Sequence, residues 1–143
     1  MTPSHVLVPL DGSRLASDAL DHALAVFDCR ITVLNIVRPL DKGMSEGAPL
    51  AIDQDRIAEA EKRATHLIAE SRGRVGPVDQ PIETVIETGD PAETILATVE
   101  SRDIDHIVMG SHGGESSELQ RRLLGTVSTA VLGAASIPVT VIR

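Results

Sequence analysis

Residues 109–128 read MGSHGGESSELQRRLLGTVS, and they follow the short, mostly apolar run IDHIV at residues 104–108. The run predicts a buried strand over 104–109, and the residues from Thr126 onward have the spacing of a helix. Glycine lets a backbone approach a ligand closely, and the first turn of a helix offers unpaired N–H groups to an anion. A strand, a glycine-rich turn and a helix start in this order predict a phosphate-binding turn, with a plain turn and helix cap as the alternative.

Strand and helix patterns alternate along the rest of the chain. Apolar and β-branched runs predict strands at 5–10, 31–37, 82–88, 104–109 and 137–142. Helical spacing predicts helices at 15–27, 53–72, 91–101 and 126–135, and residues 38–52 form a predicted loop. Ser13 or Asp11 is expected to cap the first helix, and Asp90 the third. The alternation indicates one α/β domain over 1–143 with a parallel sheet, whose ligands bind beyond the C-terminal ends of the strands.

Composition narrows the possible partners and the compartment. The formal charge of −8 and the single aromatic residue, Phe27, disfavour binding to nucleic acid, because they leave few cations for phosphates and no platform for bases. No apolar run is long enough to cross a membrane, and no signal peptide is evident at the N-terminus. The one cysteine, Cys29, predicts a reducing compartment, so we expect a cytoplasmic protein with Cys29 as a small buried residue.

Motifs for catalysis are weak or absent. Residues 43–47 match the GxSxG pattern of hydrolases, but they lie within a predicted loop rather than at a strand–turn–helix junction. The chain has no GxxxxGK[ST] phosphate-binding loop, no HExxH motif and no paired CxxC motif. We therefore expect no catalytic residues, no dedicated metal site and no enzymatic activity.

Four segments together carry a resemblance to a known family. They are VLVPLDGS at 6–13, GDPA at 89–92, MGSHG at 109–113 and LLGTVS at 123–128. In this order they resemble the universal stress protein family over essentially the full length of the chain. The resemblance implies a three-layer α/β sandwich of the adenine nucleotide alpha hydrolase-like type. Its five-stranded parallel sheet has the order 3-2-1-4-5 and carries helices on both faces.

The resemblance also implies ATP binding in many members. In those members two glycines separated by two residues are followed by nine residues, a glycine and a hydroxyl residue. Gly110, Gly113 and Gly125-Thr126 match the two ends of this pattern, whereas the segment between them, 114–124, is longer than nine residues. The nucleotide-binding positions carried over are Pro9, Leu10, Asp11, Val37, Met109, Gly110, Gly113, Gly125, Thr126, Val127 and Ser128.

Each group of these positions has an implied role. Pro9 and Leu10 would lie against the adenine, and the backbone of Val37 would meet its edge. Asp11 would lie beside the ribose or a Mg or Mn ion carried by the nucleotide, and it is the only residue with an implied metal contact. The glycines would approach the ribose and phosphates, and residues 125–128 would donate to the phosphates at the helix start.

The last predicted strand suggests how the chain associates. Residues 137–142, IPVTVI, would be an exposed apolar edge in a monomer, which predicts a homodimer with two-fold symmetry through this strand. Three functions remain open from the sequence. The first is an ATP-binding module or switch of the stress response. The second is a family member without ATP that works through dimer or partner contacts. The third is a slow ATP hydrolase, for which Asp11 is the only nearby acid or base.

Overall fold

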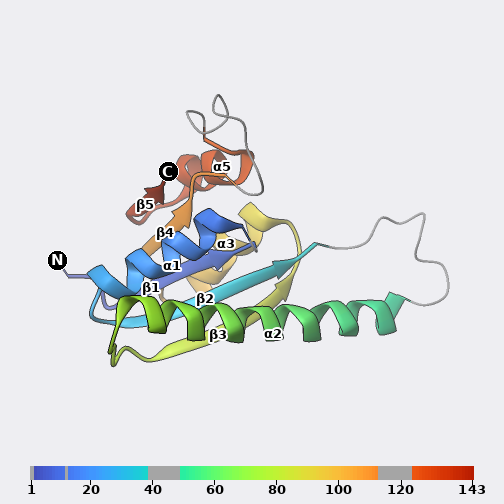
Figure 1. The fold of residues 1–143 in the computed structure, drawn as a ribbon. Coiled ribbons are helices and arrows are strands. Elements are labelled where there is room, and N and C mark those ends of the chain that lie inside the picture. The colour runs from blue at the N-terminus through green and yellow to red at the C-terminus, as the bar shows by residue number, and fades with distance from the viewer. Residues whose placement is uncertain (1, 12, 39–48, 113–123) are drawn as a thin grey trace.

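The computed structural model describes residues 2–11, 13–38, 49–112 and 124–143, and its strands form one parallel sheet (Figure 1). The strands are β1 (His5–Leu10), β2 (Arg30–Val37), β3 (Ile82–Thr88), β4 (His106–Gly110) and β5 (Val139–Ile142). The five strands lie in the order β3-β2-β1-β4-β5, which confirms the expected fold. β1 is central, and the chain adds strands first on one side of it and then on the other.

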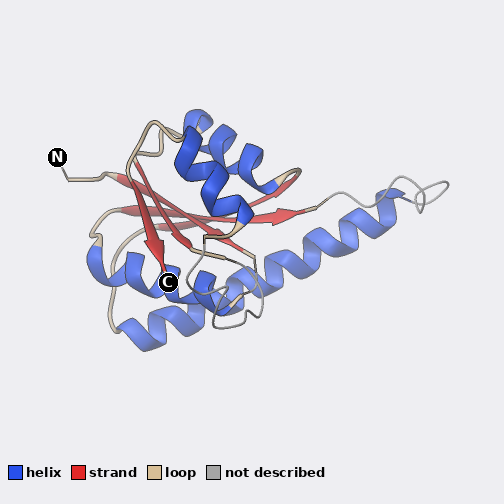
Figure 2. Ribbon diagram, turned by 90° about the horizontal axis from the view of Figure 1, so that it is seen from above, coloured by secondary structure: helices blue, strands red, loops and turns tan. Residues whose placement is uncertain are grey.

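Helices cover both faces of this sheet (Figure 2). The helices α1 (Arg14–Val26) and α2 (Pro49–Val75) pack on one face, and α3 (Pro91–Ser101) and α5 (Thr126–Ala134) pack on the other. Side chains alternate along β1, so Val6 and Val8 join the core under α1 while Leu7 joins the core under α3 and α5. A strand buried on both faces explains why residues 5–10 are apolar without alternation.

Two caps follow the sequence prediction closely. Ser13 is the N-cap of α1, and its Oγ accepts a hydrogen bond from the Ala16 N–H at 3.2 Å. Asp90 is the N-cap of α3, with Oδ2 accepting from the Glu93 N–H at 3.1 Å. Of the two alternatives for α1, Ser13 is therefore the cap.

Three elements begin at least two residues away from their predicted starts, and α2 also ends at Val75 rather than at 72. The helix α2 begins at Pro49 rather than at 53, so the predicted loop 38–52 is shorter, because proline is favoured in the first helical position. β4 begins at His106 rather than 104, since the Ile104 N–H donates to the Val99 carbonyl at 3.0 Å in the turn after α3. β5 begins at Val139 rather than 137, because Pro138 has no N–H to donate to a neighbouring strand.

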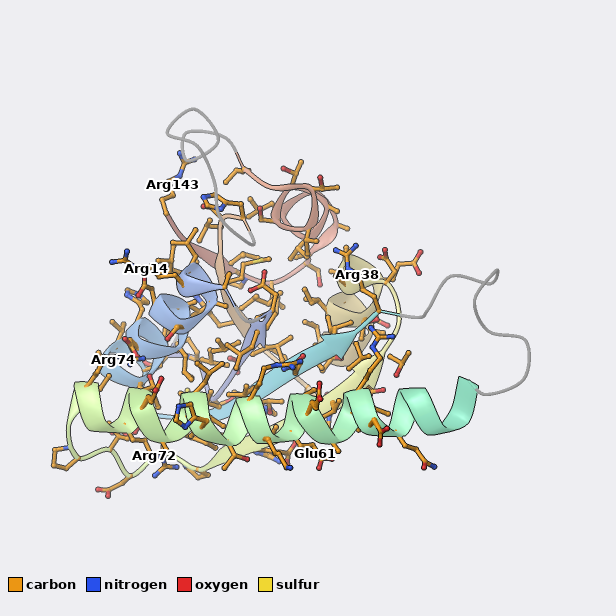
Figure 3. The ribbon with its side chains drawn as sticks, turned by 45° about the vertical axis from the view of Figure 1, so that its right-hand side comes forward. Arg14, Arg38, Glu61, Arg72, Arg74 and Arg143 are labelled. Atoms are coloured by element: carbon orange, nitrogen blue, oxygen red, sulfur yellow. The ribbon has the colours of Figure 1, made fainter. Side chains whose placement is uncertain are left out.

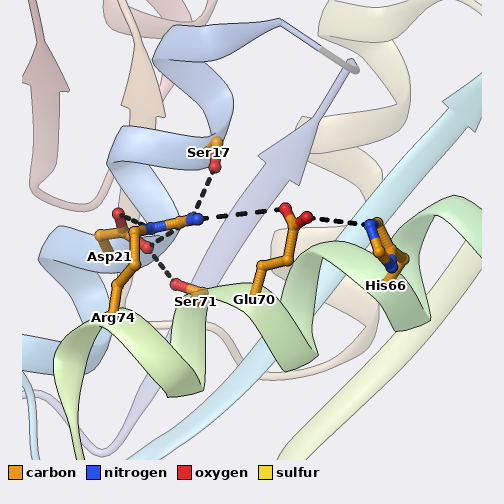
Figure 4. A network of polar contacts seen from close by, with 6 residues as sticks. All are labelled: Ser17, Asp21, His66, Glu70, Ser71 and Arg74. Carbon is orange, nitrogen blue, oxygen red and sulfur yellow. Dashed lines mark hydrogen bonds and ion pairs between the residues drawn. The ribbon is translucent and has the colours of Figure 1, made fainter.

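A polar network joins α1 to the C-terminal half of α2 (Figure 4). The fully buried Ser71 donates its hydroxyl proton to Asp21, and Arg74 Nε lies 2.9 Å from Asp21 Oδ2. Arg74 also donates to Ser17 Oγ at 3.0 Å. The salt bridges between Arg74 and Glu70 and between Glu70 and His66 extend the network along α2. These contacts fix the position of α2 relative to α1.

Candidate functional site

The candidate site lies where the C-terminal ends of β1 and β4 separate. The pairing between these strands joins Val6 to His106 and Leu7 to Ile107, at their N-terminal ends. Figure 1 shows β4 turning away from β1 beyond these pairs. The strand order reverses between β1 and β4, and ligands of such sheets bind beside this point.

Gly110, the last residue of β4, packs against the first turn of α1. A Cβ atom at this position would lie 2.8 Å from the Leu15 Cβ and 3.2 Å from the Leu15 carbonyl carbon. A side chain here would push the start of α1 away from the sheet. Gly110 therefore has a packing role of its own, and this packing holds the start of α1 beside the candidate site.

Ser111 joins three elements at the site. Its N–H donates to the Ile142 carbonyl at 2.8 Å, which ties the end of β4 to the end of β5. Its carbonyl accepts from the Gly125 N–H at 2.6 Å and from the Ser128 hydroxyl. The Ser111 side chain is fully buried, and its Oγ has no hydrogen-bond partner among the residues that the structure describes. The start of α5 is thus fixed to the two strands.

The first turn of α5 offers free donors. Its N-cap is Gly125, which has no side chain to bond the first N–H groups. Within the described ranges, no acceptor meets the backbone N–H of Thr126, Val127 or Ser128. A Cβ on Gly125 would lie 3.0 Å from both the Ser111 carbonyl oxygen and the His112 Cα, so glycine is required for this close approach. The helix start has the donors and the dipole that suit an anion.

Asp11 lies at the other side of the site, directly after β1. Its side chain is exposed, and Oδ1 accepts from the Ser13 N–H at 2.8 Å, which fixes the carboxylate in a turn. Leu10 is buried in the core under α1, and Pro9 is half-buried. Asp11 is therefore the exposed acidic side chain at the C-terminal end of β1.

The remaining positions lie deeper or outside the described residues. Val37, at the end of β2, is buried, and its carbonyl accepts from the Gly89 N–H at 3.1 Å. Met109 is buried in the core under α3 and α5. Gly113, most of the 114–124 segment and the GxSxG match at 43–47 fall in the ranges that the structure does not describe. The predicted contacts of these positions to a nucleotide stay predictions.

Three arginines lie at this edge of the sheet, and all are exposed. Arg14 begins α1, Arg38 directly follows β2, and Arg143 directly follows β5. Figure 3 shows them spread around the end of the sheet, whereas Arg72 and Arg74 lie at the far end of α2. Asp11, Glu87 and Asp90 lie at the same edge, so an anionic ligand would meet these arginines among charges of both signs.

Other reactive groups lie apart from the site. Cys29 is half-buried, and burial raises the pKa of its thiol, so the thiol stays protonated at neutral pH. His106 is half-buried in β4, and its Nε2 is hydrogen-bonded to Thr140 Oγ1 at 2.8 Å, which is a structural role. Among the described residues, no group of three or more His, Cys, Asp or Glu side chains is placed to hold a metal ion.

Sequence reasoning missed two residues that shape the site. It assigned no role to Ser111, whose backbone joins β4, β5 and α5. It also missed Leu15, whose contact explains the glycine at 110. The only sequence signal for the second contact is that Leu15 begins the apolar stripe of α1, which must lie against the sheet.

Comparisons with known proteins identify the family. A model of the universal stress protein family matches residues 3–143. A universal stress protein from Methanothermobacter thermautotrophicus is 26% identical over 141 residues, which cover 96% of this chain and 94% of that protein. In the part of the chain that the structure describes, no helix is both long and apolar enough to span a membrane.

Solved structures with the same fold include proteins with bound nucleotides. A universal stress protein in complex with cAMP has a TM-score of 0.69 at 18% identity, covering 100% of this chain and 99% of that chain. A universal stress protein family protein from Arabidopsis thaliana with AMP bound has a TM-score of 0.62 at 21% identity, covering 98% and 91%. At these identities the likeness shows the fold.

Proposed function

The chain belongs to the universal stress protein family, and we propose that it is a nucleotide-binding module or switch that takes ATP with a Mg or Mn ion. The observation that carries this proposal is the uncapped first turn of α5, whose N–H groups open beside the separated ends of β1 and β4. The exposed arginines at the same edge, among charges of both signs, are cations that a polyphosphate would meet. Relatives with the same fold hold AMP and cAMP, which supports an adenine nucleotide.

The phosphates would lie at the start of α5. The backbone N–H groups of Thr126, Val127 and Ser128 are the donors on this side. The hydroxyl proton of Ser128 already goes to the Ser111 carbonyl, so the backbone of Ser128 is its contribution to the ligand. Gly110 and Gly113 would let the chain after β4 approach the phosphates and the ribose.

The nucleoside would lie toward β1 and β2. The half-buried Pro9 would lie against the adenine, and the Val37 carbonyl would accept from its edge with the lone pair that Gly89 leaves free. The exposed carboxylate of Asp11 would meet the ribose hydroxyls or the divalent ion on the phosphates. Hydroxyl groups donate hydrogen bonds to a carboxylate, which only accepts them. A divalent cation is attracted by its negative charge and its oxygen atoms.

We propose binding rather than catalysis as the activity. Asp11 is the one acid among the proposed contacts, and its Oδ1 is already held by the Ser13 N–H. A slow ATP hydrolase, the alternative of another class, predicts hydrolysis that persists in highly purified protein and disappears in Asp11→Asn. Retained hydrolysis in that variant would remove the role of Asp11 as a base.

The homodimer belongs to the same proposal. β5 is an edge strand of the sheet, and all four of its residues are half-buried. A second copy related by two-fold symmetry would cover this edge. Sedimentation analysis should give twice the chain mass of 15.1 kDa, and a monomer at all concentrations would contradict the dimer. A dimer that binds no nucleotide would instead support the second function, a family member acting through contacts.

The decisive experiment is direct. The purified protein is denatured and any released nucleotide is identified, and ATP with magnesium is then titrated into nucleotide-free protein. Thr126→Asp places a negative charge in the exposed first turn of α5, where it should weaken ATP binding at least roughly tenfold by repulsion without destabilising the helix. The matched control is Ala69→Asp, an exposed position on α2 with the same change of charge. Absence of binding at millimolar ATP, or equal affinity in both variants, would contradict the proposal.

A further inference from the structure

A pocket lies at the end of the sheet opposite to the proposed nucleotide site. It is open, has a volume of about 420 Å³, and is formed by the C-terminal turn of α1 and the connection from α2 to β3. Figure 1 shows α1 and α2 ending on this side, near the N-terminal ends of the strands. We propose that this pocket binds an organic cation, a guanidinium or ammonium group on a short aliphatic chain. This proposal does not rest on nucleotide binding.

Part of the lining of the pocket is apolar. Val26, Phe27, Val75, Pro77 and Val78 line it. Val26 is 58% exposed, which leaves a large apolar side chain at the mouth of the pocket without cover. Phe27 is the only aromatic residue of the chain. These side chains suit an aliphatic chain, since methylene groups cover valine side chains.

Gln80 supplies a fixed acceptor within this lining. Its side chain is only 7% exposed, and Nε2 donates to the carbonyls of Leu24 at 2.8 Å and Phe27 at 2.7 Å. Because both partners are acceptors, the amide nitrogen must face them, and the orientation of the amide is fixed. Its Oε1 is left without a donor among the described residues. Held in this way, the amide presents Oε1 as an acceptor to a donor in the pocket.

The other polar groups of the pocket are acceptors too. The carbonyls of Ala25 and Val26 at the end of α1 accept no hydrogen bond from the described residues, and the last turn of α1 has no basic side chain. Asp28 and Asp79 line the pocket, are exposed, and make no ion pair within the described ranges. A helix C-terminus and two carboxylates give the pocket a negative potential.

The lining therefore selects the charge of the ligand. The side chains that line the pocket include no lysine or arginine, so an anion would meet two carboxylates and no cationic side chain. A guanidinium or ammonium group brings several N–H donors and a positive charge to the same groups. The two ends of the sheet thus suit ligands of opposite charge.

The test uses the full chain labelled with ¹⁵N and the probes agmatine, N-acetyl-arginine amide and 1-pentanol. Both cationic probes should give saturable amide shifts at residues 24–28 and 75–80, and the neutral alcohol should not. The double variant Asp28→Asn with Asp79→Asn should weaken agmatine binding roughly tenfold or more, because the attraction by two carboxylates is lost. Asp55→Asn, an exposed aspartate in the first half of α2, is the control with unchanged affinity.

The two cationic probes distinguish the source of the ligand. Binding of agmatine alone indicates a free amine, and binding of the arginine derivative indicates a side chain presented by another protein. Absence of saturable shifts with either probe, equal binding of 1-pentanol, or unchanged affinity in the double variant would overturn the proposal. Both substituted aspartates are exposed, so the fold should persist, and urea unfolding of the double variant checks this. ATP affinity measured in the same variant stays unchanged, which separates this pocket from the nucleotide site.

Discussion

The two ends of the parallel sheet differ in how their backbone N–H groups are met. At the N-terminal ends, side chains satisfy the backbone: Asp105 accepts from the Ser4 N–H at 2.9 Å, from the Ser4 hydroxyl at 2.7 Å and from the His5 N–H at 3.2 Å. At the C-terminal ends, Ser13 and Asp90 cap α1 and α3, but the N-cap of α5 is a glycine, and the first N–H groups of α5 meet no acceptor in the described ranges. At the starts of β1 and β4 the protein's own side chains meet the backbone N–H groups, whereas the start of α5 leaves its N–H groups for a ligand.

This difference shows what glycine does in the chain. A helix start capped by serine or aspartate, as in α1 and α3, uses its own side chain to satisfy an N–H group. Gly125 cannot do so, and a Cβ atom in its place would lie only 3.0 Å from the Ser111 carbonyl oxygen. The effect of replacing a glycine by a residue with a side chain therefore depends on the surroundings of that glycine. Variants can measure this effect.

Gly110→Ala should have the largest effect. The added methyl group would lie 2.8 Å from the Leu15 Cβ and 3.2 Å from the backbone of α1, so the helix must shift. We expect a loss of about 2 kcal/mol in the free energy of unfolding, typical of overpacking, together with weaker nucleotide binding. Urea unfolding and ATP titration of the same sample measure both.

Gly133→Ala is the matched control for this prediction. Gly133 lies within α5, and a Cβ there would meet nothing within 4 Å. Alanine is favoured over glycine inside a helix, so this variant should gain roughly 0.5–1 kcal/mol. Equal effects of the two substitutions would show that the contact with Leu15 does not restrict Gly110.

Asp105→Ala tests the contacts at the starts of β1 and β4 and should have the second largest effect. The substitution removes the acceptor of Ser4 and His5, and we expect a loss of about 1 kcal/mol in the free energy of unfolding at neutral pH. Burial by itself raises the pKa of this carboxyl, but the hydrogen bonds from Ser4 and His5 prevail and the pKa is lowered in the folded chain. Its stabilisation is therefore present above the unfolded value near 3.9 and is lost as the pH falls below it.

The measurement is urea unfolding of the wild type and the variant from pH 7 to pH 3. The two stabilities should differ at neutral pH and converge in acid, where the wild-type carboxylate becomes protonated. The control variant is Asp18→Ala, which removes an exposed carboxylate from α1. The free energies of unfolding of this variant and the wild type should be nearly equal. A constant difference between wild type and Asp105→Ala across this range would contradict a role for the charge of Asp105.

Local features of the fold were predictable from the sequence. Ser13 and Asp90 each accept a hydrogen bond from an N–H group three residues later. The sequence pattern and the contact that it predicts therefore lie within the same few residues. β1, buried on both faces, showed itself as a continuous apolar run. The strand order came from the resemblance to the family, because spacing along the chain does not say on which side of β1 a later strand lies.

Contacts between distant residues were not predictable. The glycines at 110 and 125 were expected to admit a ligand, yet each also lies against the protein itself, at Leu15 and at Ser111. Asp105 bonds Ser4 across the length of the chain, and no local pattern marks that pair. The site was therefore predictable in position, since the strand ends set it, but not in the bonds that hold it together.

His106→Gln should have the smallest effect and sharpens the comparison at the start of β4. The ring of His106 lies 4.8 Å from that of Phe27, and its Nε2 bonds Thr140 at 2.8 Å. Burial lowers the pKa of His106, the charge of Asp105 raises it and His22 lowers it, with a net decrease.

Because the unfolded chain then binds more protons, stability falls as the pH drops below about 6.5. Glutamine keeps a polar group for Thr140 but does not titrate, so the decrease between pH 7 and pH 5 should become smaller, with the remainder due in part to His5, whose pKa burial also lowers. An unaltered slope in His106→Gln, measured by urea unfolding across this pH range, would show that the buried ring does not contribute to the acid sensitivity at the start of β4.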